Sequence, residues 1–184
     1  MINLIACVDN RFGIGKNNDL LIRIPDDMRH FKNETLGGIC VFGRKTAESL
    51  PNKQPLSDRR NIILTHNPYY KLEGFEICND IKDILDLSAN NDVYICGGAE
   101  IYKLFMQYAD SITLTSLSEV YEADTYFPYA MMGLWMQGAM ADSLAISEGE
   151  FNFSIEALGA GSYEGVDYAI LKYIREKGEI KNNE

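Results

Sequence analysis

The sequence predicts an α/β protein with a mostly parallel central sheet, helices on both faces and an antiparallel strand near the C-terminus. Five short runs of β-branched and other apolar residues have almost continuous hydrophobicity, which is typical of strands that are buried on both faces. Segments with helical spacing separate several of these runs, as in βαβ units. The two patterns together favour a sheet covered by helices over an all-β or all-α fold.

The expected strands, in order, are residues 2–8, 39–42, 61–65, 93–96 and 112–117. Helical spacing follows the second run in TAESL and the fourth run at Ile101, Leu104, Phe105 and Tyr108. Residues 151–158 and 168–174 indicate a final antiparallel pair joined by a Gly-rich loop. We expect one domain over residues 1–175 and a charged tail over residues 176–184.

Methionines surround Trp135 in the segment 131–149. Such a cluster is more often adaptable core filler than a partner surface. The pattern does not define the structure of this segment.

The composition is typical of a soluble globular protein, with 46% hydrophobic and 24% charged residues among 184. No apolar run approaches the ~18 residues that span a bilayer, and the N-terminus has no signal-peptide pattern. We therefore expect a cytoplasmic protein. The net charge of −10 argues against nucleic acid or an anionic membrane as a partner.

The cysteines form no CxxC pair, and the sequence has two histidines, so we expect no metal site. We expect all four cysteines, Cys7, Cys40, Cys78 and Cys96, to be reduced thiols. Cys7, Cys40 and Cys96 lie in strand-like runs and act as small hydrophobic side chains. The two histidines are His30 and His66.

The segment IPDDMRHF places two acids at a predicted helix start, with Pro25 in the first turn. At ~100° per residue, Asp27 lies about 65° from the centre of the apolar stripe and Asp26 about 165° from it. The stripe consists of Ile24, Met28 and Phe31, and the polar face carries Arg29, His30 and Asn33. Asp26 is therefore expected to cap the helix.

Asp27 borders the apolar face, and its geometry supports a pocket carboxylate and an ordinary first-turn acid about equally. In an apolar cleft, a carboxylate offers two parallel acceptors to a planar edge with adjacent N–H donors, and burial raises its pKa. The preceding segment 13–25 has the composition of a loop that could cover a cleft, although a plain surface loop is the alternative.

Two strand-to-helix junctions have the chemistry of phosphate sites. GRKT, residues 43–46, combines a glycine, two cations and a threonine, and Gly97-Gly98 precedes an amphipathic helix. Each signal is weak by itself, since surface cations and tight turns are common. Together they make a dinucleotide plausible.

In order along the chain, six blocks resemble the dihydrofolate reductase family: IACVDNRFGIGKNNDLL, IPDDMRHFK, GRKTAESL, RRNIILT, ICGGAEIY and ITLTSL…YEADTYFP. The resemblance covers residues 2–128, and YAILKYIR is similar to the family's last strand. It implies a single-domain enzyme that reduces 7,8-dihydrofolate to tetrahydrofolate with NADPH in one-carbon metabolism. Antifolate inhibitors are then plausible ligands, and we expect a monomer.

The resemblance implies that Asp27 binds pterin N3 and the 2-amino group with Thr115 as its hydrogen-bonded neighbour, and that Leu20 and Ile22 complete the catalytic centre. Arg59 matches the arginine that pairs with the substrate's α-carboxylate. The implied substrate-binding residues are Ile5, Ala6, Cys7, Asp27, Met28, Phe31, Leu50, Arg59, Cys96, Tyr102 and Thr115.

For the cofactor, the resemblance implies phosphate and ribose contacts at the two junctions, a cis peptide bond between Gly97 and Gly98, and loop contacts over the nicotinamide ribose. The implied cofactor-binding residues are Ala6, Ile14, Asn18, Gly43, Arg44, Lys45, Thr46, Thr65, His66, Cys96, Gly97, Gly98, Ala99, Glu100, Ile101, Tyr102 and Thr125. Leu21-Ile22 stands where many family members have Pro-Trp.

Two alternatives stay open. A pyrimidine reductase of riboflavin synthesis shares the fold and the use of NADPH, but its ribityl phosphate substrate does not require Asp27 or Arg59. A binding or scaffold protein that has lost turnover is the other. The presence of Asp27, Thr115, Arg59 and Tyr102 together argues against it.

Overall fold

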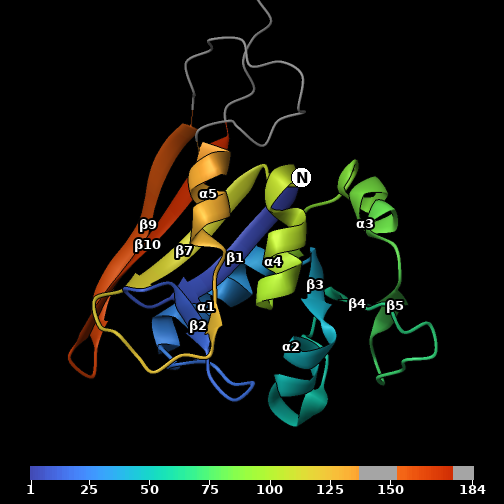
Figure 1. Cartoon of the computed structure of the whole chain (residues 1–184), viewed down its shortest axis with the longest axis horizontal. Coiled ribbons are helices and arrows are strands. Elements are labelled where there is room, and N and C mark those ends of the chain that lie inside the picture. Colours follow the sequence, from blue (N-terminus) through green and yellow to red (C-terminus); the bar gives the residue numbers. More distant parts are fainter. Residues whose placement is uncertain (137–152, 176–184) are drawn as a thin grey trace, which may run out of the picture.

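The computed structural model describes residues 1–136 and 153–175, and the segments 137–152 and 176–184 lie outside the described residues (Figure 1). The predicted tail and part of the Met-rich segment, including Met140, are therefore not described. Among the described residues, no helix is long and apolar enough to cross a membrane.

The core of the molecule is an eight-stranded sheet with the order β5-β4-β3-β6-β1-β7-β10-β9. Its strands are β1 (Ile2–Val8), β3 (Ile39–Gly43), β4 (Arg60–Leu64), β5 (Glu76–Cys78), β6 (Val93–Ile95), β7 (Ser111–Leu117), β9 (Phe153–Tyr163) and β10 (Val166–Arg175). The pairs from β5 to β7 are parallel, and β10 is antiparallel to both of its neighbours. The predicted mostly parallel sheet with an antiparallel C-terminal strand is confirmed.

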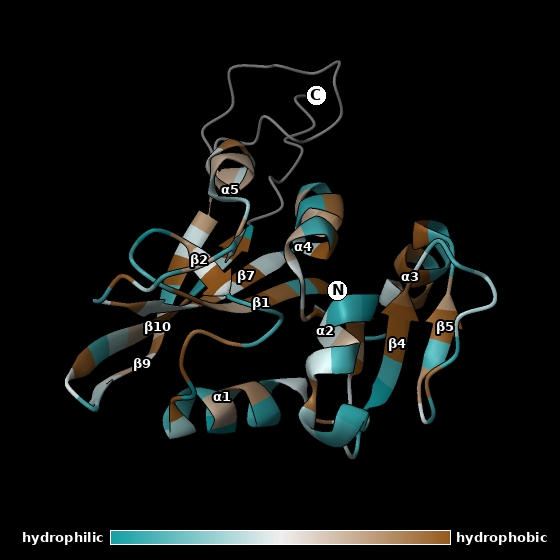
Figure 2. Cartoon of the chain, turned by 60° about the horizontal axis from the view of Figure 1, so that its bottom comes forward, coloured by the Kyte–Doolittle hydropathy of each residue, from teal (hydrophilic) through white to brown (hydrophobic). Residues whose placement is uncertain are grey.

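Helices cover both faces of this sheet, as predicted (Figure 2). On one face α3 (Ile81–Ser88), α4 (Ala99–Phe105) and α5 (Tyr129–Met136) pack on β1, β3 and β6 through Ile84, Phe105 and Trp135. On the other face lie α1 (Pro25–Thr35) and α2 (Arg44–Ser49), with Phe31 and Ala47 in the core.

The shorter elements complete the chain. Single 3-10 turns occur at Pro51–Lys53 and Met106–Tyr108, and β2 (Gly13–Gly15) pairs with β8 (Thr125–Tyr126) in a small second sheet. The sequence patterns did not indicate β2, β5, β8, α3 or α5. The short strands are too brief for a clear period of two.

The predicted apolar face of the helix after β6 was wrong in two of its four positions. Phe105 is fully buried, but Leu104 is 40% and Tyr108 is 41% exposed. Tyr102 and Met106 are buried instead. The helix ends at Phe105 and tightens into a 3-10 turn, so the spacing of 3.6 residues per turn does not extend to Tyr108.

The predicted Gly-rich loop before the last strand was also wrong. Strand β9 continues to Tyr163, and the hairpin turns at Glu164 and Gly165, which have φ values of 50° and 84°. Positive φ at both central residues is the geometry of a two-residue hairpin turn that matches the twist of the strands. Residues 159–163 therefore form strand, and Gly161 lies opposite Tyr168.

Of the Met-rich segment, the described part is helix α5. Met132 and Trp135 are buried, Met131 and Met136 pack against the same core, and the Trp135 indole donates a hydrogen bond to the carbonyl of Ala109 at 3.0 Å. This part is core, in agreement with the core-filler interpretation.

Candidate active site

The carboxyl ends of the parallel strands enclose a cavity with a volume of about 960 Å³. Three junctions contribute to its walls: β3 to α2, β4 to the following loop, and β6 to α4. Ligands of open α/β sheets bind at this edge of the strands. The cavity is lined by twelve of the predicted cofactor residues: Asn18, Gly43, Arg44, Lys45, Thr46, Thr65, His66, Gly98, Ala99, Glu100, Ile101 and Thr125.

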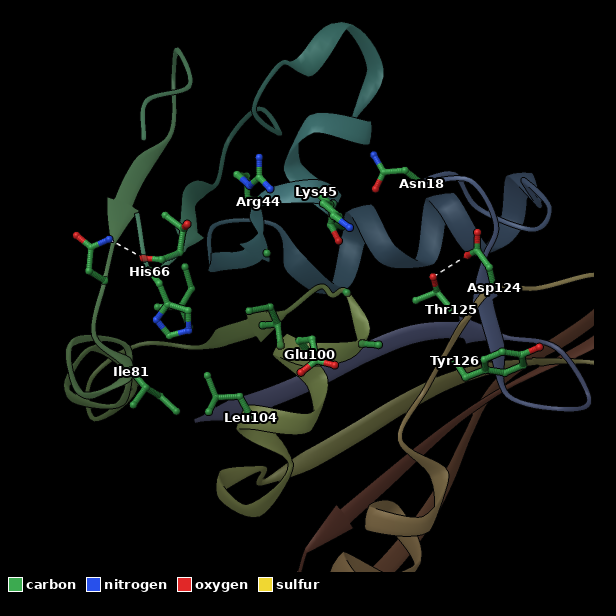
Figure 3. A pocket seen from close by; sticks show the side chains of 18 of the residues that line it. Asn18, Arg44, Lys45, His66, Ile81, Glu100, Leu104, Asp124, Thr125 and Tyr126 are labelled. Atoms are coloured by element: carbon green, nitrogen blue, oxygen red, sulfur yellow. Dashed lines mark hydrogen bonds between the residues drawn. The ribbon is translucent and has the colours of Figure 1, made fainter. Parts of the chain in front are cut away.

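Figure 3 shows Arg44 and Lys45 on one wall of this cavity, where α2 begins. Glu100 and Leu104 lie on the wall made by α4, and His66 and Ile81 lie at one end. Cations and hydroxyl groups are the donors that bind phosphate oxygens. The donor set and the size of the cavity fit a dinucleotide.

The Gly97-Gly98 peptide bond is cis, as the family resemblance implies. The Gly97 carbonyl accepts a hydrogen bond from the Gly43 amide at 2.6 Å, which ties the ends of β3 and β6 together. Neither position has room for a larger side chain without displacing a neighbour. A Cβ on Gly97 would lie 3.1 Å from the Tyr102 hydroxyl oxygen, and one on Gly98 would lie 3.1 Å from Thr46 Oγ1.

A second, smaller cavity of about 120 Å³ adjoins the first and shares Asn18, Thr46, Gly98 and Thr125 with it. Tyr102 closes its inner side, because its hydroxyl donates to the Ile5 carbonyl at 2.7 Å. The remaining predicted cofactor residues, Ala6, Ile14, Cys96, Gly97 and Tyr102, line it together with Cys7 and Leu20.

Asp27 lies in the first turn of α1 and points toward the sheet. Its Oδ1 accepts a hydrogen bond from the Thr115 hydroxyl of β7 at 2.5 Å. Thr115 is paired in register with Cys7 of β1, which lines the smaller cavity. The carboxylate is thus held beside that cavity by a strand 88 residues away in sequence.

The surroundings of Asp27 change its acidity. Burial raises the pKa of the Asp27 carboxyl, while the hydrogen bond from Thr115 and the charge of His30 act in the opposite direction. Burial is the largest of these effects, so the proton is held more tightly than by an ordinary aspartate. Burial likewise raises the pKa of the Cys7 thiol, so the thiol stays protonated.

Asp26 is exposed, as the helical angle predicts, but its predicted capping role was wrong. The helix has Ile24 at its N-cap and no side-chain capping hydrogen bond. Asp26 instead pairs with Arg29 and accepts a hydrogen bond from the Tyr168 hydroxyl at 2.6 Å. Asp26 therefore binds the Tyr168 hydroxyl of β10 instead of the backbone amides at the start of the helix.

Several predicted substrate residues gather on the α1 face of the sheet. Ile5 is buried in one apolar cluster, against which the predicted residues Phe31, Leu50 and Cys96 also pack. Met28 and Leu20 are 42% and 44% exposed, so Met28 is exposed although Ile24 of the same stripe is buried.

Arg59 lies at the far end of α1, where its Nη1 donates to Thr35 Oγ1 at 3.0 Å and its Nε donates to the Ser57 carbonyl at 2.9 Å. Ile22 packs on a separate cluster that contains Ile24 and Tyr168. Eight predicted site residues line neither of the two cavities: Ile5, Ile22, Asp27, Met28, Phe31, Leu50, Arg59 and Thr115.

The segment from Gly13 to Ile24 makes hydrogen bonds and an ion pair with β8 and with the residues just before it. The Asn17 amide donates to Asp124 Oδ2 at 2.8 Å, and Lys16 forms an ion pair with Glu122 at 2.5 Å. The segment therefore lies over the smaller cavity, to which it contributes Ile14, Asn18 and Leu20.

Sequence reasoning missed other lining residues, which are Gly15, Lys16, Asp19, Ser49, Leu64, Asn79, Asp80, Ile81, Leu104, Asp124 and Tyr126. Asn79 and Asp80 directly follow β5 and could have been found, because parallel strands meet at the same edge. Leu104 lies one turn after Ile101 on the same side of α4.

The fold and the site define a class: an α/β reductase that binds a dinucleotide at the carboxyl edge of its sheet, next to a partly buried carboxylate. A sequence profile described as dihydrofolate reductase matches residues 1–157. The chain belongs to the dihydrofolate reductase family. It is therefore an enzyme, an NADPH-dependent oxidoreductase that acts on dihydrofolate.

Individual relatives agree with this placement. The chain is 36% identical to the dihydrofolate reductase of Bacillus subtilis (strain 168) over 129 residues, which cover 70% of this chain and 76% of that protein. It is 32% identical to that of Staphylococcus haemolyticus over 153 residues, or 83% of this chain and 91% of the relative.

Among solved structures, dihydrofolate reductase from Enterococcus faecalis complexed with NADP(H) and RAB-propyl has a TM-score of 0.78. It is 26% identical in sequence, and the match covers 96% of this chain and 97% of that one. The likeness extends over nearly the whole fold.

Proposed function

We propose that the chain reduces 7,8-dihydrofolate to 5,6,7,8-tetrahydrofolate by hydride transfer to pterin C6 and protonation at N5, with Asp27 as the residue that holds the pterin. The single observation that carries this assignment is the partly buried Asp27 carboxylate, fixed by Thr115 beside a cavity that adjoins a dinucleotide-sized one.

Asp27 has two tasks in this proposal. Its oxygens accept hydrogen bonds from pterin N3 and the 2-amino group, a bidentate contact that sets the orientation of the ring. Its negative charge also favours protonation at N5, to which water delivers the proton. Thr115 occupies one side of Oδ1, so Oδ2 and the remaining lone pair of Oδ1 face the ligand.

Bound NADPH supplies the hydride from nicotinamide C4. Arg44, Lys45 and Thr46 bind the cofactor phosphates, and Ile14 and Asn18 cover the nicotinamide ribose. Tyr102 and the glycine pair shape the wall against which the nicotinamide lies, and Leu20 excludes bulk water from the reacting rings.

The rest of the substrate is held by the opposite end of α1. Ile5, Met28, Phe31, Leu50 and Cys96 supply apolar contacts for the ring and its substituent. Arg59 binds the α-carboxylate of the glutamate tail, because a guanidinium matches a carboxylate with two parallel hydrogen bonds. A ribityl phosphate substrate would use neither Asp27 nor Arg59, so these residues favour a pterin over a riboflavin precursor.

Four further proposals accompany this one. Residues 1–175 act as a single catalytic domain with residues 176–184 as a tail. The enzyme is a monomer, and it works in the cytoplasm. Antifolates that carry a diaminopyrimidine ring bind at Asp27.

Oxidation of NADPH, followed by its near-ultraviolet absorbance, tests the proposal. We expect rapid oxidation when dihydrofolate is present and almost none without it. Binding of NADPH and dihydrofolate with no turnover would instead show a protein that has lost catalysis, and oxidation that needs no folate would contradict the substrate assignment.

A further inference from the structure

Arg44 has an acidic neighbour that ought to neutralise it. Glu48 lies four residues further along α2, a spacing at which opposite charges attract each other on a helix. The distance from Arg44 Nη1 to Glu48 Oε1 is nevertheless 3.8 Å, beyond the range of ~2.7–3.2 Å for a hydrogen bond. None of the hydrogen bonds among the described residues uses the Arg44 guanidinium as a donor, so its donors remain open toward the cavity.

Tyr70 binds the acidic member of this pair. Its hydroxyl donates to the same oxygen, Glu48 Oε1, at 2.8 Å. Tyr70 comes from the loop between β4 and β5, and it packs on the apolar cluster that contains Phe42 and Ile63. Burial, followed by the hydrogen bond to Glu48, raises the pKa of Tyr70, so the phenol keeps its proton and acts as the donor.

The aromatic ring of Tyr70 also contacts the cation. Arg44 Cζ lies 5.9 Å from the ring centroid, within the range of a cation–π interaction. The one side chain therefore contacts the guanidinium through its ring and the carboxylate through its hydroxyl.

We propose that Tyr70 is a positioning residue for cofactor choice, because its hydroxyl restrains Glu48 and so keeps the Arg44 guanidinium available to a phosphate of the cofactor. The inference rests on the proposed role of Arg44 as a contact to the 2′-phosphate that distinguishes NADPH from NADH. Without the hydroxyl, Glu48 would close onto Arg44 and compete with the phosphate for the same N–H donors.

The first test is Tyr70→Phe, which keeps the ring and removes the hydroxyl. We expect KM for NADPH to rise about two- to fivefold, the effect of a competing exposed ion pair. KM for NADH, KM for dihydrofolate and kcat should not change. A parallel rise in KM for dihydrofolate, or a loss of NADH affinity of equal size, would show a merely structural role and overturn the proposal.

The second test uses Glu48. Glu48→Gln removes the competing charge, so it should not raise KM for NADPH, and the double variant Tyr70→Phe/Glu48→Gln should behave like Glu48→Gln alone. If the double variant keeps the full defect of Tyr70→Phe, Glu48 does not mediate the effect and the proposal is wrong.

Arg44→Ala separates this inference from the proposed function. It should remove most of the preference for NADPH over NADH, and Tyr70→Phe should have no further effect in that background. An unchanged preference in Arg44→Ala would refute the phosphate role of Arg44. A lost preference in Arg44→Ala, together with full preference in Tyr70→Phe, would refute the role of Tyr70 alone.

Discussion

The Asp27 carboxylate is partly removed from solvent. Its pKa is raised because the cost of burial exceeds the help from Thr115 and His30. The free protein therefore bears an energetic cost for a group that a pterin would later satisfy. Such a cost is expected of a preorganised binding residue.

Removal of this charge should stabilise the free protein. Because the native pKa is raised, the native state binds more protons than the unfolded state between the two pKa values, and stability falls as pH rises through that window. We expect Asp27→Asn to unfold at a higher denaturant concentration than the wild type at neutral pH, where the wild-type carboxylate is charged.

The gain should disappear below the ordinary pKa of a carboxyl group, where both states of the wild type are protonated. Urea unfolding of the two proteins at several pH values measures it. A stability difference that does not vary with pH would show that the charge of Asp27 is not the cause.

The directions of individual side chains were predicted correctly where helical geometry alone determines them. The angle between Asp26 and Asp27 follows from helical geometry, and the structure has the first exposed and the second turned inward. The partner of Asp26 could not be found in this way. Tyr168 is 142 residues away, and only the packing of β10 against α1 brings them together.

At the scale of elements, the C-terminal hairpin helps to hold α1. The Tyr168 side chain of β10 lies across Gly161, its partner on β9, and its hydroxyl binds Asp26 of α1. A Cβ on Gly161 would lie 2.5 Å from the Tyr168 hydroxyl oxygen and 2.8 Å from its ring carbon Cζ. The missing side chain of Gly161 therefore makes room for this contact between sheet and helix.

Gly161→Ala should displace the Tyr168 ring and break its hydrogen bond to Asp26. We expect a loss of about 1–3 kcal/mol in the free energy of unfolding, the usual effect of overpacking. Gly159→Ala is the matched control on the same strand, since its Cβ would meet only Ile170 Cδ1 at 3.8 Å. Equal stability of the two variants in urea unfolding would contradict this role of Gly161.

The same hairpin shows why prediction of elements was incomplete. The buried strands β1, β3 and β7 were predicted within one residue because almost all of their residues are buried, which gives each strand a short run rich in apolar or β-branched residues. Strand β9 is exposed along almost its whole length, so burial leaves no pattern in its sequence. Its glycines are explained by a neighbouring strand, which the local sequence does not reveal.

At the scale of the whole molecule, the site exists because parallel strands end at one edge. Residues from β3, β4, β6 and the chain near β8 meet there, and the Arg44-Lys45 pair supplies positive charge within a chain of net charge −10. The resemblance placed seventeen cofactor residues, and all of them line one of the two cavities. Asn79 and Asp80 were missed because β5 itself was not recognised.

The measurement that tests the central claim most directly compares turnover of dihydrofolate by Asp27→Asn and Asp26→Asn at neutral pH. The two substitutions are chemically identical, but the two side chains point in different directions. Asn at position 26 can still accept the hydrogen bond from Tyr168. Asn at position 27 removes the negative charge that the hydrogen bond from Thr115 fixes beside the cavity. We predict a fall in turnover by orders of magnitude for Asp27→Asn and little change for Asp26→Asn. Equal activity of the two variants would contradict the assignment of Asp27.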